Sequence, residues 1–200
     1  MKKIPMVKIE YNKTFLIQIN KDLGVRNNAL PILKNKEAAL RMETKRIRNR
    51  IEEINSRLKQ MIEGVAYMQR LCCELPPLVK LEKIEFTRKK VASVNVQVVD
   101  KVIFRTESFS VFAYPAWFLQ GMEIIKQAMQ IKIELMNEER ILAAVEYARR
   151  KTTQKVNLYE KVQIPFFEEA IRRIKRFLED EENLSKSSQK VIKNRMEFAA

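Results

Sequence analysis

Apolar side chains recur in steps of three and four residues along the first third of the chain, once the polar occupants Arg26, Glu37 and Thr44 are counted. This heptad pattern passes through Leu16, Ile19, Leu23, Leu30, Leu33, Leu40, Ile47, Ile51, Ile54, Leu58, Met61, Val65, Met68, Cys72 and Leu75. It predicts a helix over residues 12–75. At 1.5 Å per residue, about 60 residues make a helix of about 90 Å, which needs an equally long companion to cover its apolar side.

Prolines mark the expected irregularities of this helix. Pro31 lies inside the pattern, where a missing amide hydrogen predicts a kink or a short break. Pro76 and Pro77 follow the last apolar position, and a proline pair cannot continue a helix.

Between residues 84 and 112 the pattern changes to alternation. Val94, Val96 and Val98 alternate with polar residues, and a second apolar run, 102–104, follows Asp100-Lys101. These runs predict a β-hairpin. The region has no Asn-Gly or Asp-Gly pair, so its register stays open.

Pro115 and Trp117 fit the first turn of a second helix. Its apolar positions are Ile124, Ala128, Ile131, Leu135, Leu142, Val145, Val156, Tyr159, Ile164, Phe167, Ile171, Ile174 and Leu178. We expect this helix over residues 116–190, with a bend at Pro165 and a fraying polar end after Glu179. The expected fold is mainly α: two long helices in an antiparallel coiled coil, with a short β-hairpin between them, in a single elongated domain over residues 1–200.

The sequence lacks residues and motifs that many enzymes use for catalysis. The chain has no histidine, and no glycine-rich phosphate loop occurs in it. Cys72 and Cys73 are adjacent, lack further ligands, and are interpreted as packing residues rather than a metal or redox site. We therefore expect no catalytic residues, no cofactor and no metal.

The charge points to an anionic partner. The chain carries 39 Lys and Arg against 25 Asp and Glu, a net charge of +14. Nucleic acid, a membrane surface and an acidic protein cavity all fit this value. No apolar run is long enough to span a membrane, and the start of the chain is no signal peptide, so we expect a cytoplasmic protein.

A motif in the second helix distinguishes between these three kinds of anionic partner. A basic stretch, 149–155, runs into Val156-Asn157-Leu158-Tyr159-Glu160, then Ile164-Pro165, then residues 168–175, Glu-Glu-Ala-Ile-Arg-Arg-Ile-Lys. This region resembles the second-helix signature of the D subunit, the central rotor shaft of V-type and A-type rotary ATPases. Residues 12–16 and 33–36 are similar to the opening segments of the same family.

The resemblance implies a non-catalytic shaft that couples ATP hydrolysis or synthesis to proton or sodium transport by rotating. It implies that the paired terminal segments enter a hexameric head of A and B subunits. It also implies that the F subunit clasps the coil and that a funnel-shaped adaptor joins the opposite end to the membrane rotor. The complex would hold the chain at the periphery of the membrane.

The antiparallel arrangement also predicts where basic side chains gather. If the first helix ends near Leu75 and the second begins near Trp117, residues whose numbers add to about 192 lie side by side. Two basic runs then form one collar, and the family resemblance implies that this collar faces acidic loops of the head. Its residues are Lys45, Arg46, Arg48, Arg50, Arg149, Arg150 and Lys155. A solvated surface of long helices is the alternative.

Two other functions fit parts of the sequence. A basic coiled-coil arm could grip nucleic acid through its phosphates, although few exposed aromatic residues are interleaved with the basic runs. An amphipathic scaffold on a membrane surface does not fit, because the apolar stripes match a coiled-coil seam rather than a broad lipid-facing side. We therefore expect neither nucleic acid nor direct membrane insertion.

Overall fold

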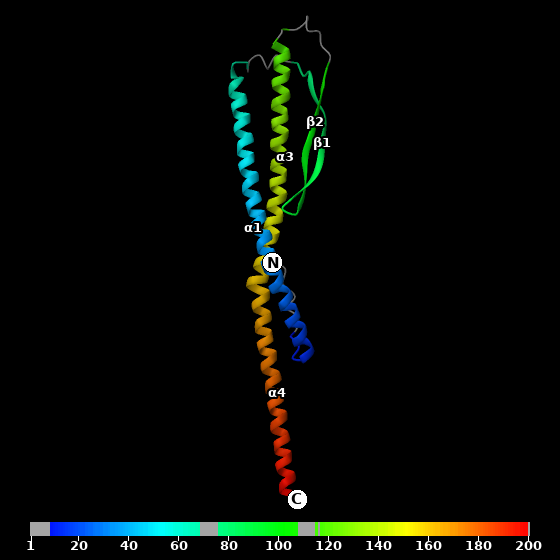
Figure 1. Ribbon diagram of the computed structural model, residues 1–200, viewed down its shortest axis with the longest axis vertical. Coiled ribbons are helices and arrows are strands. Elements are labelled where there is room, and N and C mark those ends of the chain that lie inside the picture. Colours follow the sequence, from blue (N-terminus) through cyan, green and yellow to red (C-terminus); the bar gives the residue numbers. More distant parts are fainter. Residues whose placement is uncertain (1–8, 69–75, 108–114, 116, 200) are drawn as a thin grey trace. The chain divides into compact units, whose positions relative to one another are not determined.

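The computed structural model describes residues 9–68, 76–107, 115 and 117–199. The described elements are, in chain order, α1 (Lys13–Gly64), the short 3₁₀ helix η1 (Ala66–Met68), β1 (Val79–Val91), β2 (Val94–Thr106), α3 (Trp117–Leu158), the π-helical turn η2 (Tyr159–Gln163) and α4 (Ile164–Ala199) (Figure 1). The predicted fold class is confirmed: the chain is mainly α-helical, with one antiparallel hairpin between the N-terminal and the C-terminal helices.

The chain divides into two compact units. The first, here called the terminal unit, holds residues 1–35 and 152–200, and the second, the central unit, holds residues 36–151. Both α1 and α3 contribute to both units, and each unit is described by itself. The single elongated domain over residues 1–200 stays a prediction.

In the terminal unit, the start of α1 packs against α4. Asn12 caps α1, because its side-chain Oδ1 accepts a hydrogen bond of 2.6 Å from the amide of Phe15. Ile19 of α1 lies in a buried cluster with Phe167, Ala170, Ile171 and Ile174 of α4. The start of α1 and the first part of α4 therefore share one core.

Pro165 sits next to a π-helical turn rather than in a simple bend. Proline has no amide hydrogen and crowds the carbonyl one turn before it. The turn η2 widens there, and the amide of Ile164 donates to the carbonyl of Tyr159, five residues earlier. This turn shifts the helix by one residue at the position where the sequence predicts an irregularity.

The end of α4 differs from the prediction of a fraying polar segment. The helix continues to Ala199, and every side chain from Glu179 to Glu197 is exposed. Figure 1 shows this red end of α4 running on past the first, dark blue turn of α1. The segment 179–199 contains neither glycine nor proline. It also carries the i,i+4 ion pairs Glu182–Lys186 and Lys193–Glu197, which support an exposed helix.

The structure excludes a break at Pro31 and a helix that runs to residue 75, whereas a kink at Pro31, the other alternative, stays a prediction. Helix α1 is continuous through Pro31, and the Asn27 carbonyl that loses its partner belongs to an exposed residue, where water can replace the bond. The helix ends at Gly64, well before residue 75, in a tightened turn where the Val65 amide donates to the carbonyls of Met61 and Ile62. Cys72 and Cys73 lie outside the described residues.

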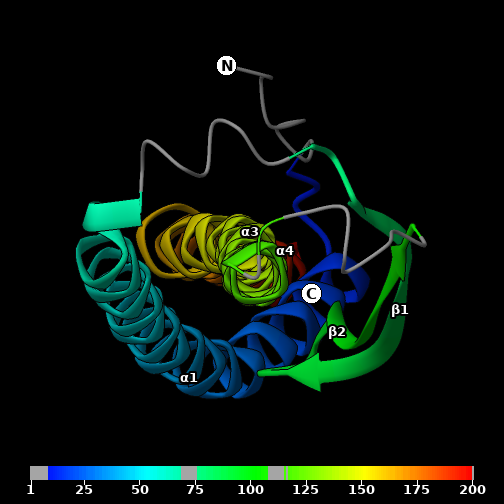
Figure 2. The ribbon, with the colours of Figure 1, turned by 90° about the horizontal axis from the view of Figure 1, so that it is seen from above.

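In the central unit, the hairpin forms a third layer beside the two helices. Val96 of β2 is buried with Leu40 and Ile47 of α1 and with Ile141 and Val145 of α3. Figure 1 shows both strands running beside α3, and Figure 2 shows from above how the hairpin curves. Leu40 and Val145 are fully buried at this junction.

The turn of the hairpin lies at Ala92-Ser93, not at Asp100-Lys101. Both turn residues have positive φ angles, 46° and 70°, as the two-residue hairpin turn demands. Asp100 and Lys101 lie inside β2. Register shifts between Leu81 and Lys83 and between Glu85 and Phe86 interrupt the alternation along β1. The missing turn signal and these bulges explain why the sequence pattern alone misplaced the turn.

Candidate interaction surfaces

Ion pairs join α1 to α3 in the central unit. Arg48 pairs with Glu146 at 2.5 Å, Arg50 with Glu138 at 3.1 Å, and Arg57 with Glu134 at 3.8 Å. The two residue numbers add to 194 in the first pair, 188 in the second and 191 in the third. The helices are therefore antiparallel in this unit, at about the register that the sequence predicts.

The structure brings some of the predicted collar residues together. Arg48 of α1 and Arg150 of α3 both pair with Glu146, at 2.5 Å and 3.8 Å. Arg50 is held by Glu138. Three of the collar cations are thus already neutralised in part by acids of the same chain, which the basic runs alone did not indicate.

The remaining collar residues are less constrained. Lys45 and Arg46 are exposed on α1, and Arg149 is half-buried on α3. Among the described residues, none of these three side chains has an ion-pair partner within 4.0 Å. Lys155 is exposed and belongs to the terminal unit.

Two buried polar residues lie next to each other on α3. Glu138 is 7% exposed and accepts a hydrogen bond from Arg50, so its charge is compensated. Asn137 is equally buried, and its Oδ1 atom has no hydrogen-bond partner within the described part of the chain. A small cavity of about 120 Å³ between Asn137, Ile84 and Phe86 separates this side of α3 from the hairpin.

In the terminal unit, polar contacts fix the π-helical turn to α1. The Arg26 side chain donates from Nε to Gln163 Oε1 at 2.9 Å and lies over the ring of Phe167 at 4.4 Å. Lys34 pairs with Glu160 at 2.7 Å. The motif singled out in the sequence therefore contacts α1 at both ends of the turn.

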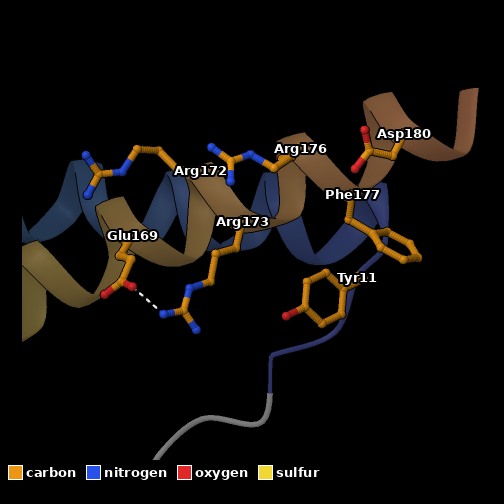
Figure 3. A pocket seen from close by; sticks show the side chains of 7 residues that line it. All are labelled: Tyr11, Glu169, Arg172, Arg173, Arg176, Phe177 and Asp180. Atoms are coloured by element: carbon orange, nitrogen blue, oxygen red, sulfur yellow. Dashed lines mark hydrogen bonds and ion pairs between the residues drawn. The ribbon is translucent and has the colours of Figure 1, made fainter. Parts of the chain in front are cut away.

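A shallow groove follows on α4 (Figure 3). Tyr11 stacks in a tilted arrangement on Phe177, with ring centroids 5.0 Å apart. Arg173 pairs with Glu169 of the same helix, whereas Arg172 and Arg176 extend from the other side of α4 than Tyr11 (Figure 3). Tyr11 precedes the apolar pattern of the first helix, so periodicity gave no reason to select it.

Two exposed carboxyl groups have shifted pKa values. The side-chain hydrogen bond from Lys80 lowers the pKa of Glu107, and the one from Lys186 lowers the pKa of Glu182. The stabilisation from such a pair is present above the ordinary carboxyl pKa and is lost as the pH falls through the lowered value. Both groups are exposed, so these pairs contribute little to the free energy of unfolding.

A comparison of the sequence with protein families decides which family the chain belongs to. The family model for the D subunit of ATP synthase matches residues 15–194. The chain belongs to the ATP synthase D-subunit family. The match runs through α1, the hairpin, α3 and nearly all of α4, so it includes the middle section as well as the motif in the second helix.

Individual relatives agree with the family match. The D subunit of the V-type ATP synthase of Borreliella burgdorferi is 27% identical over 192 residues, which cover 94% of this chain and 95% of the relative. The D subunit of the A-type ATP synthase of Saccharolobus solfataricus is 23% identical and covers 93% of each chain. The corresponding V-type protein of Chlamydia abortus is 29% identical over 76% of each chain.

Within the described residues, no helix of this family member combines the length and the apolar character that crossing a membrane requires. The long helices instead alternate a buried side with a charged side. Hairpin residues Lys89 and Lys90 approach the collar cations of α1, which sequence analysis missed because the hairpin turn was misplaced.

Proposed function

We propose that this chain is the non-catalytic central-stalk subunit of a V-type or A-type ATPase. It couples ATP hydrolysis or synthesis in a head of A and B subunits to ion transport across the membrane, by rotating as a shaft. The observation that carries the proposal is the family match over residues 15–194, together with the paired long helices. The chain then works at the cytoplasmic periphery of the membrane, bound to the F subunit and to the funnel-shaped adaptor.

The physical basis of the role is stiffness along a rod. A long helix owes most of its stability to the packing of its apolar side against a partner, and a shaft needs this stability to keep its helices from unwinding. In the central unit, buried Leu40 and Val145 and the interhelix ion pairs fasten α1 to α3. In the terminal unit, Ile174 and the Arg26–Gln163 bond do the same between α1 and the segment formed by η2 and α4.

The experiment that tests this role is purification of the complex through an affinity tag on this chain. We expect stoichiometric amounts of nucleotide-binding A and B subunits, and ATP hydrolysis that belongs to the complex and not to the isolated chain. A chain that purifies alone, or with nucleic acid in place of these subunits, would contradict the proposal.

Within the proposed function, the collar provides the electrostatic contact between the shaft and the head. Lysine and arginine can exchange carboxylate partners as a shaft turns, whereas close-packed apolar contacts resist sliding. Arg48, Arg50 and Arg150 already have partners in the chain, so Lys45, Arg46 and Arg149 supply most of the charge available to the head.

The collar is tested by the double substitution Arg46→Gln and Arg149→Gln. We expect weaker binding to the head, a smaller dependence of binding on salt, and unchanged helix content. The matched control is Lys59→Gln with Lys132→Gln, which removes the same charge from exposed positions on the same two helices. Equal binding and equal salt dependence in both variants would leave the collar as a solvated surface.

A further inference from the structure

The tip of the hairpin meets α1 and α3 at a groove, and most of the residues that line this groove lie outside the collar. The groove has a volume of about 300 Å³ and lies wholly within the central unit. Its residues come from α1, from both strands and their turn, and from α3: Glu43, Arg46, Ile47, Arg50, Lys89, Lys90, Val91, Ala92, Val98, Glu138 and Ile141.

The register of the hairpin directs Lys89 toward the helices. Lys89 is the cross-strand partner of Val96, and directly paired residues project to the same side of a sheet. Val96 is buried among Leu40, Ile47 and Val145. The Lys89 side chain therefore projects from the helix-facing side of the hairpin, where it lines the groove.

The charges around the groove are not balanced. Four cations line it, Arg46, Arg50, Lys89 and Lys90, against the two carboxylates Glu43 and Glu138. Glu138 is engaged by Arg50 at 3.1 Å. Within the described part of the chain, Arg46, Lys89 and Lys90 have no ion-pair partner. Four cations against two carboxylates leave an excess of positive charge around the groove, which a bound anion reduces.

The rest of the lining identifies the kind of anion. Ile47, Val91, Ala92, Val98 and Ile141 are apolar, so an apolar floor lies between the cations. A free phosphate gains nothing from apolar surface. A protein segment that carries carboxylates beside an apolar side chain can use both the cations and the floor.

We propose that this groove binds an acidic, amphipathic segment of another subunit of the complex. Its carboxylates pair with Lys89 and Arg46, and an apolar side chain of the segment covers the floor near Val98. Lys90, the cross-strand partner of Asn95, projects to the other side of the strand and adds positive charge near the groove. The inference rests on the proposed function only in requiring a multisubunit complex, and it assigns a contact to the hairpin tip that shares Arg46 with the collar.

The test is cross-linking in the purified complex from a photoreactive residue at position 43, for example Glu43→p-benzoylphenylalanine. This site lines the groove and leaves its four cations in place. We expect one cross-linked segment from another subunit, with at least two Asp or Glu residues close to an apolar residue. A cross-link to a segment without acidic residues, to nucleic acid or to a second copy of this chain would overturn the proposal.

Matched charge variants separate this contact from general electrostatics. Lys89→Gln with Lys90→Gln should reduce the cross-link at least about tenfold, as the loss of the charge-assisted contact of Lys89 and of the neighbouring charge of Lys90 predicts. The control, Lys80→Gln with Lys83→Gln, removes the same charge from the same strand, where these lysines pair with Glu107 and Glu85, and should leave the yield unchanged. Equal yields in the two variants would contradict the proposal.

Three further outcomes are distinguished. Inorganic phosphate that binds the full chain through Lys89 and Lys90, in a complex that gives no cross-link, would replace the segment by a free anion and overturn the proposal. If the A and B subunits are present and no cross-link forms, the groove proposal fails and the proposed function stands. If no complex is recovered, both fail.

Discussion

The terminal unit and the central unit cover the apolar sides of their helices with different numbers of layers. In the terminal unit, α1 and α4 cover each other around Ile19, Phe167 and Ile174, and the last part of α4 has no described segment against it. In the central unit, the hairpin adds a third layer over α1 and α3 through Val96. Two helices alone leave much of each surface in water, so the third layer makes the central core more completely enclosed.

The largest expected difference concerns core truncation. Leu40 and Ile174 are both 0% exposed, but only Leu40 is also covered by the hairpin. We expect Leu40→Ala to lower the free energy of unfolding by about 4 kcal/mol and Ile174→Ala by about 3 kcal/mol, because a more enclosed cavity collapses less. Urea unfolding of the full chain, followed by circular dichroism, measures both.

A surface position gives the control for this pair. Ile32 is 69% exposed on α1, so Ile32→Ala should change the free energy of unfolding by less than about 0.5 kcal/mol. A larger loss for Ile174→Ala than for Leu40→Ala would mean that the hairpin adds nothing to the enclosure of the central core.

Breaking an ion pair should also lower the free energy of unfolding by different amounts in the two units, but by less than truncation of a core residue. Arg50→Gln leaves Glu138, whose side chain is only 9% exposed, without its cation. We expect a loss of about 1–2 kcal/mol, below the value for a fully buried pair because Arg50 itself is half exposed. Lys34→Gln in the terminal unit breaks an exposed pair and should cost less than about 0.5 kcal/mol. Equal losses in thermal unfolding would show that the burial of Glu138 has no energetic weight.

Much of the fold was predictable from the sequence, since helix periodicity records which side of a helix is buried. Thirteen-residue strands with two register shifts do not keep their alternation, and Ala92-Ser93 carries no turn signal. The hairpin was therefore expected, but its turn was not. Neither the end of α1 at Gly64 nor the helical end of α4 followed from proline positions, because prolines mark only some helix ends.

The candidate surfaces were less predictable than the fold. Basic runs on two antiparallel helices gave the collar, but the acids that occupy it, Glu138 and Glu146, are read only from the packed structure. Lys89 and Lys90 are far in sequence from Arg46, and only the position of the hairpin turn brings them to the same groove. Long-range contacts of this kind depend on register, which a single sequence does not specify.

One substitution should stabilise the terminal unit rather than destabilise it. Gly24 lies inside α1, and a Cβ atom there would have no neighbour within 4 Å. Gly24→Ala should raise the free energy of unfolding by about 0.8 kcal/mol, since alanine loses less backbone freedom in a helix. Thermal unfolding of the full chain provides the measurement, and a lower midpoint would indicate that this stretch of α1 does not form a regular helix.

Rotation is the most direct test of the proposed function. The complex is fixed through its head, Cys72 and Cys73 are replaced by serine, and a bead is attached through Lys101→Cys on the exposed side of β2. We predict that the bead turns in one direction while the complex hydrolyses ATP, and that it stops when ATP is removed. A bead that stays still on a complex that continues to hydrolyse ATP would contradict the account.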